Sequence, residues 1–448
     1  MAVITNPTLA ADVVAYLQEE VLPITRKQLV AYQFGNPLRL DKGRGLTYTA
    51  SRYIRFPLPF QPLTEAVPIT TSQSLVVQQV TATAQQWGDR AIVSDVAEMT
   101  IFHPPFQTAK NLIELQMAET LERNSFNALM SGTQVNFVNT RGSRAALIAG
   151  DILDPTTVAR TTANLRTIGA PRFMGDEQTN EMKGVDEGGG RASDNPRAMP
   201  HYAAIVHTNV VGDFRTNSTV STAWSYSDTN RLYNYEIGEW AGMRFCESNM
   251  VPTFTGVAQI NGTTGTAGAL ATGTYYVQVT ASDTQNQYES RIYQVSASVS
   301  VTGPTGSISV VLPTLAGYTF NVYVGTAASP TNLGLCAAGP SSGPFIGQAV
   351  QLAGNQTVVI TNLGLAQTPP AAPATGVTVY PTFVFGRDAY GQVVLDDPRF
   401  EYLDKADKSD MHNQLRAVTW KIMYGTIILN QQFFARIESS SSIPNTFG

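Results

Sequence analysis

Charged residues are scarce in this chain. Asp, Glu, Lys and Arg make up 14% of its 448 residues, whereas an average globular domain carries about 25%. Because charged side chains are depleted from the centres of protein interfaces, a low charge content favours a protein that gives much of its surface to partners. The net charge is −5, so no overall basic field of the kind that attracts nucleic acid is expected.

Cysteine is almost absent, and long apolar runs are missing. Cys246 and Cys336 are the only two cysteines and have no Cys-x-x-Cys spacing, which excludes a disulfide framework and a thiolate metal site. No run approaches the roughly 18 apolar residues of a membrane helix. The first nine residues lack the basic start and apolar core of a secretory signal. We therefore expect synthesis in a cytoplasm and no membrane partner.

Motifs of catalysis are also missing. The four histidines are His103, His201, His207 and His412. His201 and His207 are six residues apart, which does not match a helical zinc pair, and we interpret them as ordinary strand or surface residues. The glycines at 188–190 are not followed by Gly-Lys-Ser/Thr, so a phosphate-binding loop is not expected there. We predict that the protein is not an enzyme and needs no cofactor or metal.

Two helices are indicated by apolar residues at helical spacing. From Phe106 to Leu129 apolar positions recur every three or four residues, which predicts a long helix within residues 104–132. A second helix is predicted between Asp154 and Gly169, because Asp is a common N-terminal cap and Gly a common terminator. Strands are expected nearby, so the body should be α+β.

A long two-stranded excursion is predicted over residues 46–86. Two strand-like segments, Leu46–Arg55 and Leu75–Gln86, flank a proline-rich stretch. Such a hairpin has little to bury against within its own domain and is marginal in water, so we expect it to lie on a neighbouring subunit. Its cations Lys42, Arg44, Arg52 and Arg55 are candidate inter-subunit contacts. The alternative is an ordinary solvated strand face.

The composition changes abruptly between Pro252 and Thr375. Only Asp283, Glu289 and Arg291 are charged there. Strand-like segments recur between Gly, Pro, Asn and Ser turns, which predicts an all-β sandwich. The predicted strands are Gly273–Thr280, Arg291–Val301, Gly306–Leu312, Tyr318–Val324 and Thr357–Thr361. Their pattern resembles fibronectin type III and immunoglobulin-like modules.

The segment after the sandwich resumes the character of the chain before it. Val377–Gly386 is predicted to be a strand, and Asp396-Asp397-Pro398 is predicted to form a turn. The Ala- and Pro-rich stretch Gln367–Thr375 is interpreted as a return linker. An insertion into one continuous domain is the simplest explanation, because insertions are tolerated where the ends of a domain lie close together.

Three ordered blocks outside the sandwich resemble the major capsid proteins of tailed bacteriophages, in the group named after the podophage N-four. The first contains Leu29-Val30, Phe34-Gly35, Arg52-Tyr53 and Leu63-Thr64-Glu65. The second contains Tyr202-Ala203-Ala204-Ile205-Val206-His207, Glu236-Ile237-Gly238-Glu239 and Gly242-Met243-Arg244-Phe245. The third contains Trp420-Lys421, Tyr424-Gly425 and Leu429-Asn430. The likeness covers most of the chain outside residues 252–375.

The resemblance implies the Hong Kong 97-type phage capsid fold with an inserted immunoglobulin-like domain. Its parts would be an N-terminal arm (1–45), an extended loop (46–86), a peripheral domain (87–149) with a spine helix (104–132), the first part of an axial domain (150–251), the inserted sandwich (252–375) and a segment completing both domains (376–448).

The function implied is self-assembly into hexamers and pentamers of an icosahedral head that encloses double-stranded DNA. The partners implied are further copies of the chain, scaffolding and portal proteins, DNA held without sequence specificity, and a decoration protein or host-surface glycan at the insert. The protein would be assembled in the bacterial cytoplasm and reside in the virion. The alternative is another virion component, such as a tail or receptor-binding protein with a carbohydrate-binding sandwich.

Overall fold

The computed structural model of the chain describes residues 29–41, 43, 45–58, 72–100, 105–173, 200–225, 233–283, 288–336, 352–353, 357–363, 367–403 and 414–443. The glycine-rich segment 174–199 and the whole arm before residue 29 lie outside this range. No helix within it is both long and apolar enough to cross a membrane.

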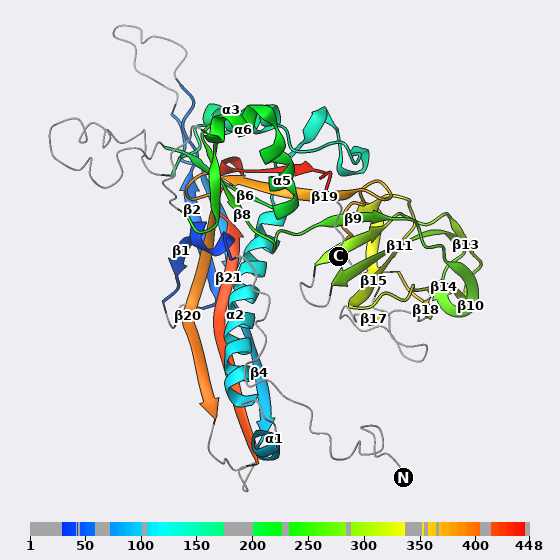
Figure 1. The fold of residues 1–448 in the computed structure, drawn as a ribbon. Coiled ribbons are helices and arrows are strands. Elements are labelled where there is room, and N and C mark those ends of the chain that lie inside the picture. Colours follow the sequence, from blue (N-terminus) through cyan, green and yellow to red (C-terminus); the bar gives the residue numbers. More distant parts are fainter. Residues whose placement is uncertain are drawn as a thin grey trace, which may run out of the picture.

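An elongated lobe is formed by one long helix packed along a sheet (Figure 1). The helix α2 (Pro105–Met130) confirms the predicted one. The sheet has the order β1 (Asn36–Arg39), β20 (Tyr390–Leu403), β21 (Leu415–Ile428) and β4 (Gln85–Ser94). Ile113 and Leu121 of α2 pack on apolar side chains of β21, which include Trp420 and Tyr424. At the far end of the lobe lies α1 (Asp95–Thr100).

The turn predicted at Asp396-Asp397-Pro398 is wrong. These residues lie inside β20, whose pairing with β21 shifts register between Val394 and Asp396 and again between Asp396 and Arg399. A bulge leaves residues without a partner in the ladder. It therefore accommodates Pro398, which has no N–H to donate, without ending the strand.

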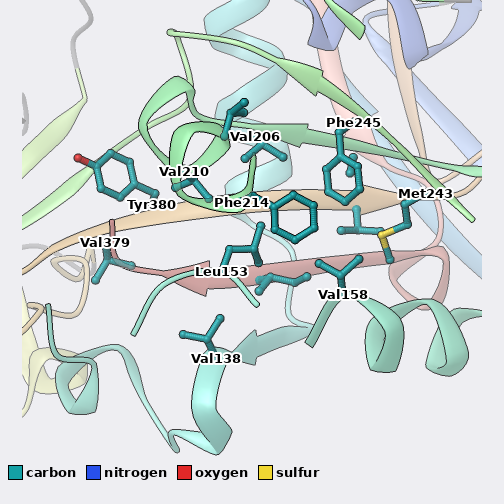
Figure 2. Packing of buried hydrophobic residues seen from close by; sticks show 14 of the residues in the cluster. Val138, Leu153, Val158, Val206, Val210, Phe214, Met243, Phe245, Val379 and Tyr380 are labelled. Carbon is teal, nitrogen blue, oxygen red and sulfur yellow. The ribbon is translucent and has the colours of Figure 1, made fainter. Parts of the chain in front are cut away.

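The central body is a mixed sheet with helices above it. Its strands are β5 (Val135–Phe137), β6 (Tyr202–Val206), β7 (Glu236–Trp240), β8 (Met243–Glu247), β19 (Thr378–Phe385) and β22 (Phe434–Ser439). Its helices are α3 (Pro155–Ile168), α5 (Thr208–Thr216) and α6 (Ser218–Ser225). Figure 2 shows Val158, Phe214 and Phe245 meeting in the core between them.

The second predicted helix is confirmed as α3. Asp154 accepts a hydrogen bond from the N–H of Thr157 at 3.3 Å, and Gly169 ends the helix with a φ of 77°. Short 3-10 helices lie at Ala31–Phe34, Val138–Thr140, Arg144–Ala146, Pro330–Asn332 and Gln431–Phe433.

The low-charge region forms two packed sheets. One has the order β10 (Thr263–Leu270), β14 (Gly306–Val311) and β18 (Thr357–Ile360). The other contains β11 (Gly273–Asp283), β12 (Glu289–Tyr293), β13 (Val299–Val301), β15 (Tyr318–Gly325), β16 (Leu333–Cys336) and β17 (Leu352–Ala353). Side chains of both sheets share one apolar core, which includes Val277, Val310 and Phe320. The predicted sandwich layering is thus present.

One predicted strand of the sandwich, Arg291–Val301, is interrupted. It consists of β12 and β13, separated by residues 294–298. Ser296 causes the break, because its hydroxyl accepts from the N–H of Val277 at 2.9 Å while its own N–H donates to the Val277 carbonyl at 2.8 Å. A side chain thus replaces one bond of the ladder.

Candidate subunit-contact surfaces

The predicted excursion contains an antiparallel strand pair whose described residues pack on the body at its base. β2 (Thr47–Tyr53) pairs with β3 (Val77–Thr83), with Thr47 opposite Thr83 and Tyr53 opposite Val77. At the base, Ala82 and Ala84 are buried with Val393 of β20. The second strand was predicted to reach Gln86, but β3 ends at Thr83 and Gln85 already begins β4.

Away from the base the excursion exposes large apolar side chains. Those more than two fifths exposed are Tyr53, Ile54, Phe56, Leu58, Leu75, Val76 and Val77. Leu58 reaches 73% and Tyr53 reaches 68%. Contiguous apolar exposure of this kind marks a surface that another molecule covers. The whole excursion was predicted to lie on a neighbouring subunit, but only its cations were named as individual contact residues. The apolar residues on both faces of its strands are further candidates for that contact.

The four candidate cations have different positions in the structure. The Nε and Nη2 atoms of Arg52 donate to the side-chain oxygen of Gln78, directly across the hairpin, at 2.9 and 2.6 Å. This contact orients the guanidinium along the strand pair. Arg55 is exposed, and no ion pair joins it to the parts of the chain given above. Lys42 and Arg44 lie outside the described residues.

A second apolar surface lies at the far end of the lobe, around α1. Met99 is 76% exposed, Val96 60%, and Ile92 of β4 48%. Val96 and Met99 are three residues apart and therefore share one face of the helix. The acid on α1 nearest to them, Glu98, accepts from Arg416 at 2.5 Å. This surface was not predicted from the sequence, since a six-residue helix carries too little periodicity to be recognised.

The root of the N-terminal arm is fixed to α2 by a buried carboxylate. Glu122 is fully buried, and its oxygens accept from the backbone N–H groups of Val30, Ala31 and Tyr32 at 2.6, 2.6 and 2.9 Å. Burial raises the pKa of the Glu122 carboxyl, and the three N–H groups oppose that change. Residues 30–32 are thus fixed to α2 at a defined point on the body.

The described histidines have structural partners. His207 caps α5 by accepting from the N–H of Asn209 at 3.2 Å, and burial lowers its pKa to about 4. The Nε2 atom of His201 lies 3.0 Å from the hydroxyl of Tyr233. Within the described ranges no three His, Cys, Asp or Glu side chains gather in a way that could hold a metal ion.

No family model matches the sequence, and no curated protein is similar to it. Solved structures do match the fold. The capsid of Ralstonia phage GP4 is 9% identical, with a TM-score of 0.52 over 99% of both chains. The cyanophage Pam1 capsid asymmetric unit is 10% identical, with a TM-score of 0.51 over 97% of this chain and 98% of that one. The chain therefore has the α+β fold of phage capsid proteins, which confirms the predicted fold at that level.

Proposed function

We propose that this chain is the major capsid protein of a tailed phage. In this proposal it assembles with its own copies into hexamers and pentamers of an icosahedral head around double-stranded DNA, and it resides in the virion without catalytic activity. The observation that carries the proposal is the β2–β3 excursion. On a capsid fold, a hairpin that packs at its base and exposes its apolar side chains beyond it needs another subunit to cover it.

The assembly mechanism depends on two separate exposed surfaces. The excursion and the α1 surface lie on different parts of the chain, so contacts between them would be head-to-tail. A contact of this type closes into a ring when its rotation allows it. Each contact can be weak, because the closed array multiplies it. Low charge supports this mechanism, since it lowers the desolvation cost of covering so much surface.

The finer assignments belong to the same proposal. Segment 46–86 would be the extended loop and α2 the spine helix of a Hong Kong 97-type subunit of the N-four group. The sandwich at 252–375 would be immunoglobulin-like and would face outward, where an added domain leaves shell contacts free. Two packed antiparallel sheets with a shared core support the immunoglobulin-like assignment.

Electron microscopy of the purified, recombinantly expressed chain tests the proposal. Icosahedral shells of uniform size, or abundant hexamers, are expected. Fibres, trimeric spikes, or a monomer that binds glycans would instead support the tail or receptor-binding alternative.

A further inference from the structure

The sandwich shares a sheet with the body. The strand β9 (Phe254–Val257) pairs with β12 of the sandwich on one side and with β19 of the body on the other. The N–H of Gly256 donates to Val377 at 2.9 Å, and the N–H of Gly376 donates back to Gly256 at 2.9 Å. Figure 1 shows β9 and β19 beside each other, between the body and the sandwich. The segments that enter and leave the insert are therefore hydrogen-bonded to each other.

The stretch interpreted as a return linker is also packed. Ala372 is buried, and the carbonyl of Pro373 accepts from the side-chain amide of Gln294 at 2.5 Å. Phe254, Ile292 and Ala372 belong to the same apolar core as Leu153 and Val379 of the body. The boundary of the insert thus has none of the features of a flexible tether.

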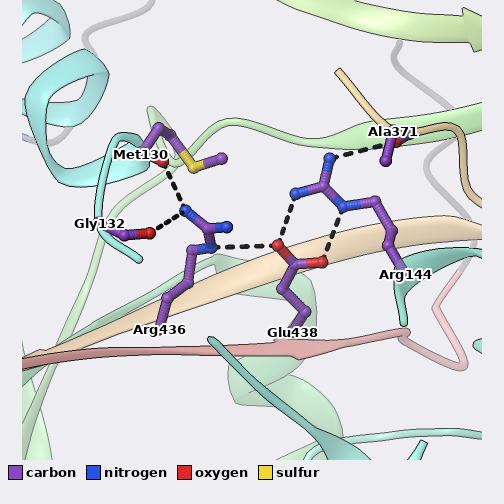
Figure 3. Close-up of polar contacts among 6 residues, drawn as sticks. All are labelled: Met130, Gly132, Arg144, Ala371, Arg436 and Glu438. Carbon is purple, nitrogen blue, oxygen red and sulfur yellow. Dashed lines mark hydrogen bonds and ion pairs between the residues drawn. The ribbon is translucent and has the colours of Figure 1, made fainter. Parts of the chain in front are cut away.

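A buried arginine joins both crossing segments to the body. Figure 3 shows Arg144 facing Glu438 of β22, with its Nε at 2.7 Å and its Nη2 at 2.5 Å from the two carboxylate oxygens. Its Nη1 donates to the carbonyl of Ala371, in the leaving segment, at 3.3 Å. Its guanidinium carbon lies 4.2 Å from the ring centre of Phe254, in the entering segment. One side chain therefore contacts both segments at once.

The same carboxylate connects to the end of α2. Arg436 donates from Nε to Glu438 at 3.0 Å and from Nη1 to the carbonyl of Met130, the last residue of α2, at 2.6 Å. A further contact from Nη1 reaches the carbonyl of Gly132 at 3.4 Å. The connection runs from α2 through Arg436, Glu438 and Arg144 to the two segments of the insert (Figure 3).

This cluster is suited to fixing geometry more than to adding stability. Exposure is 8% for Arg144 and for Arg436, and 1% for Glu438. Burial alone would raise the pKa of the Glu438 carboxyl, but the hydrogen bonds and charges of the two arginines outweigh it and lower that pKa. Removing ions from water costs about as much as their pairing returns, so this buried group is expected to add little net stability, and its role here is inferred to be orientation. An arginine fork adds directional bonds that an apolar contact would lack.

We infer that Arg144 and Glu438 lock the sandwich at a fixed angle to the body and to α2, so that insert and body move as one rigid unit. The inference concerns the isolated subunit and does not depend on shell assembly. It differs from a decorating domain on a flexible linker, for which the two parts would sample many relative orientations.

Distance measurement between two spin labels tests the inference on the full chain. The labels are placed at Arg160→Cys on α3 and Val311→Cys on β14, both exposed positions. The native cysteines do not interfere, because Cys246 and Cys336 are 0% and 7% exposed. Burial also raises the pKa of the Cys336 thiol to about 12. A narrow distance distribution is expected for the parent, and a broad one overturns the inference.

The variants Arg144→Gln and Glu438→Gln should widen the distance distribution. Arg144→Lys keeps the charge but cannot contact Glu438, Ala371 and Phe254 together, so it should widen the distribution less. Arg141→Gln is the matched control, because Arg141 is a nearby arginine that pairs with Asp151 at 2.8 Å. Unchanged width in Arg144→Gln, or equal widening in Arg141→Gln, overturns the inference. Protection of Cys246 from thiol reagents shows that each variant is folded. If Arg144→Gln does not fold, Arg144→Lys is used in its place, and an unchanged distribution width in Arg144→Lys then overturns the inference.

Discussion

Arg52 and Arg55 lie on the β2–β3 excursion, whose described residues beyond the base are largely exposed. Arg52 contacts only its cross-strand neighbour Gln78 among the described residues, and Arg55 is exposed. Neither side chain contributes to a buried core, so charge reversal at both positions should leave the monomer folded. A surface substitution of this type typically changes stability by no more than about 0.5 kcal/mol.

We expect Arg52 and Arg55 to meet acids of the next subunit. The double variant Arg52→Glu/Arg55→Glu should then block assembly, because it places like charges opposite each other. Electron microscopy counts the particles, and circular dichroism checks the fold. Arg52→Gln/Arg55→Gln is the control for loss of charge without reversal, and it should assemble more weakly than the parent but better than the reversed variant. Normal particles from the reversed variant would assign these residues to a solvated strand face.

The titration of His207 makes the free energy of unfolding depend on pH. Its imidazole is buried, and its pKa falls from 6.5 to about 4 in the folded chain. Between these values the unfolded chain binds a proton that the folded chain does not, so stability is lost as the pH falls from 6.5 toward 4. The loss should reach about 3 kcal/mol at most.

The variant His207→Asn separates this effect from the role of the residue as a helix cap. Asn also caps helices well, but it does not titrate. Urea unfolding of the parent between pH 4 and 7 should show the decline, and the variant should show a flatter one. The variant also loses the ring contact with Tyr380, which lowers stability at every pH. Equal slopes would mean that the pKa of His207 is the same in the folded and the unfolded chain.

Helices were predictable at the scale of the element because their signals are local. The apolar periodicity of α2 comes from residues close together in the sequence. The same holds for the cap and the terminator of α3. Strand details were less predictable. β10 was missed because its run of Thr, Gly and Ala has no alternation. β20 was also missed, and a turn was predicted at Asp396-Asp397-Pro398 instead, because a bulge depends on the partner strand β21.

The candidate site was only partly predictable for the same reason. The position of the excursion followed from its prolines and strands, and its exposure followed from the absence of a local core. The role of Arg144 could not be predicted. Its partners Phe254, Ala371 and Glu438 are distant in sequence, and only the folded sheet brings them together.

Two glycines that follow helices illustrate the difference between backbone and packing requirements. Gly169 after α3 has a left-handed φ of 77° and open space where a Cβ would lie. Gly132 after α2 has no left-handed φ, but a Cβ there would lie 2.1 Å from the ring of Phe434. Gly132 is the last residue of the predicted range 104–132, but Phe434 of the neighbouring strand β22 is what requires a glycine there.

Replacement by Asn distinguishes the two glycines, because Asn tolerates the left-handed region but needs room. Gly169→Asn should cost less than Gly169→Ala, which should cost about 1–2 kcal/mol. Gly132→Asn should cost more than Gly132→Ala, since each added atom displaces Phe434, with about 1–3 kcal/mol expected for overpacking. Chemical unfolding of the four variants measures this order. The same order at both positions would mean that both glycines serve the backbone.

At the scale of the whole molecule, composition located the insert but not its attachment. The loss of charge between Pro252 and Thr375 reflects a sandwich held by its own core. Composition does not indicate that three residues inside this boundary belong to the core of the body. They are Phe254, Ile292 and Ala372. Charged residues are scarce in a sandwich interior, in a core shared with the body and in a subunit interface. Composition alone therefore cannot distinguish these three environments.

Two deletions therefore should behave differently. Replacing 254–374 by a short linker follows the compositional boundary and removes all three of these core residues, together with the contacts of Arg144 to Phe254 and Ala371. Replacing 258–370 keeps Phe254, Ala371 and Ala372, and its ends start from segments that already lie side by side. Large-to-small losses in a core cost about 2–5 kcal/mol each, so the shorter deletion should give the more soluble and more heat-resistant chain. Equal solubility and equal melting temperatures would instead favour an insert that is independent of the body.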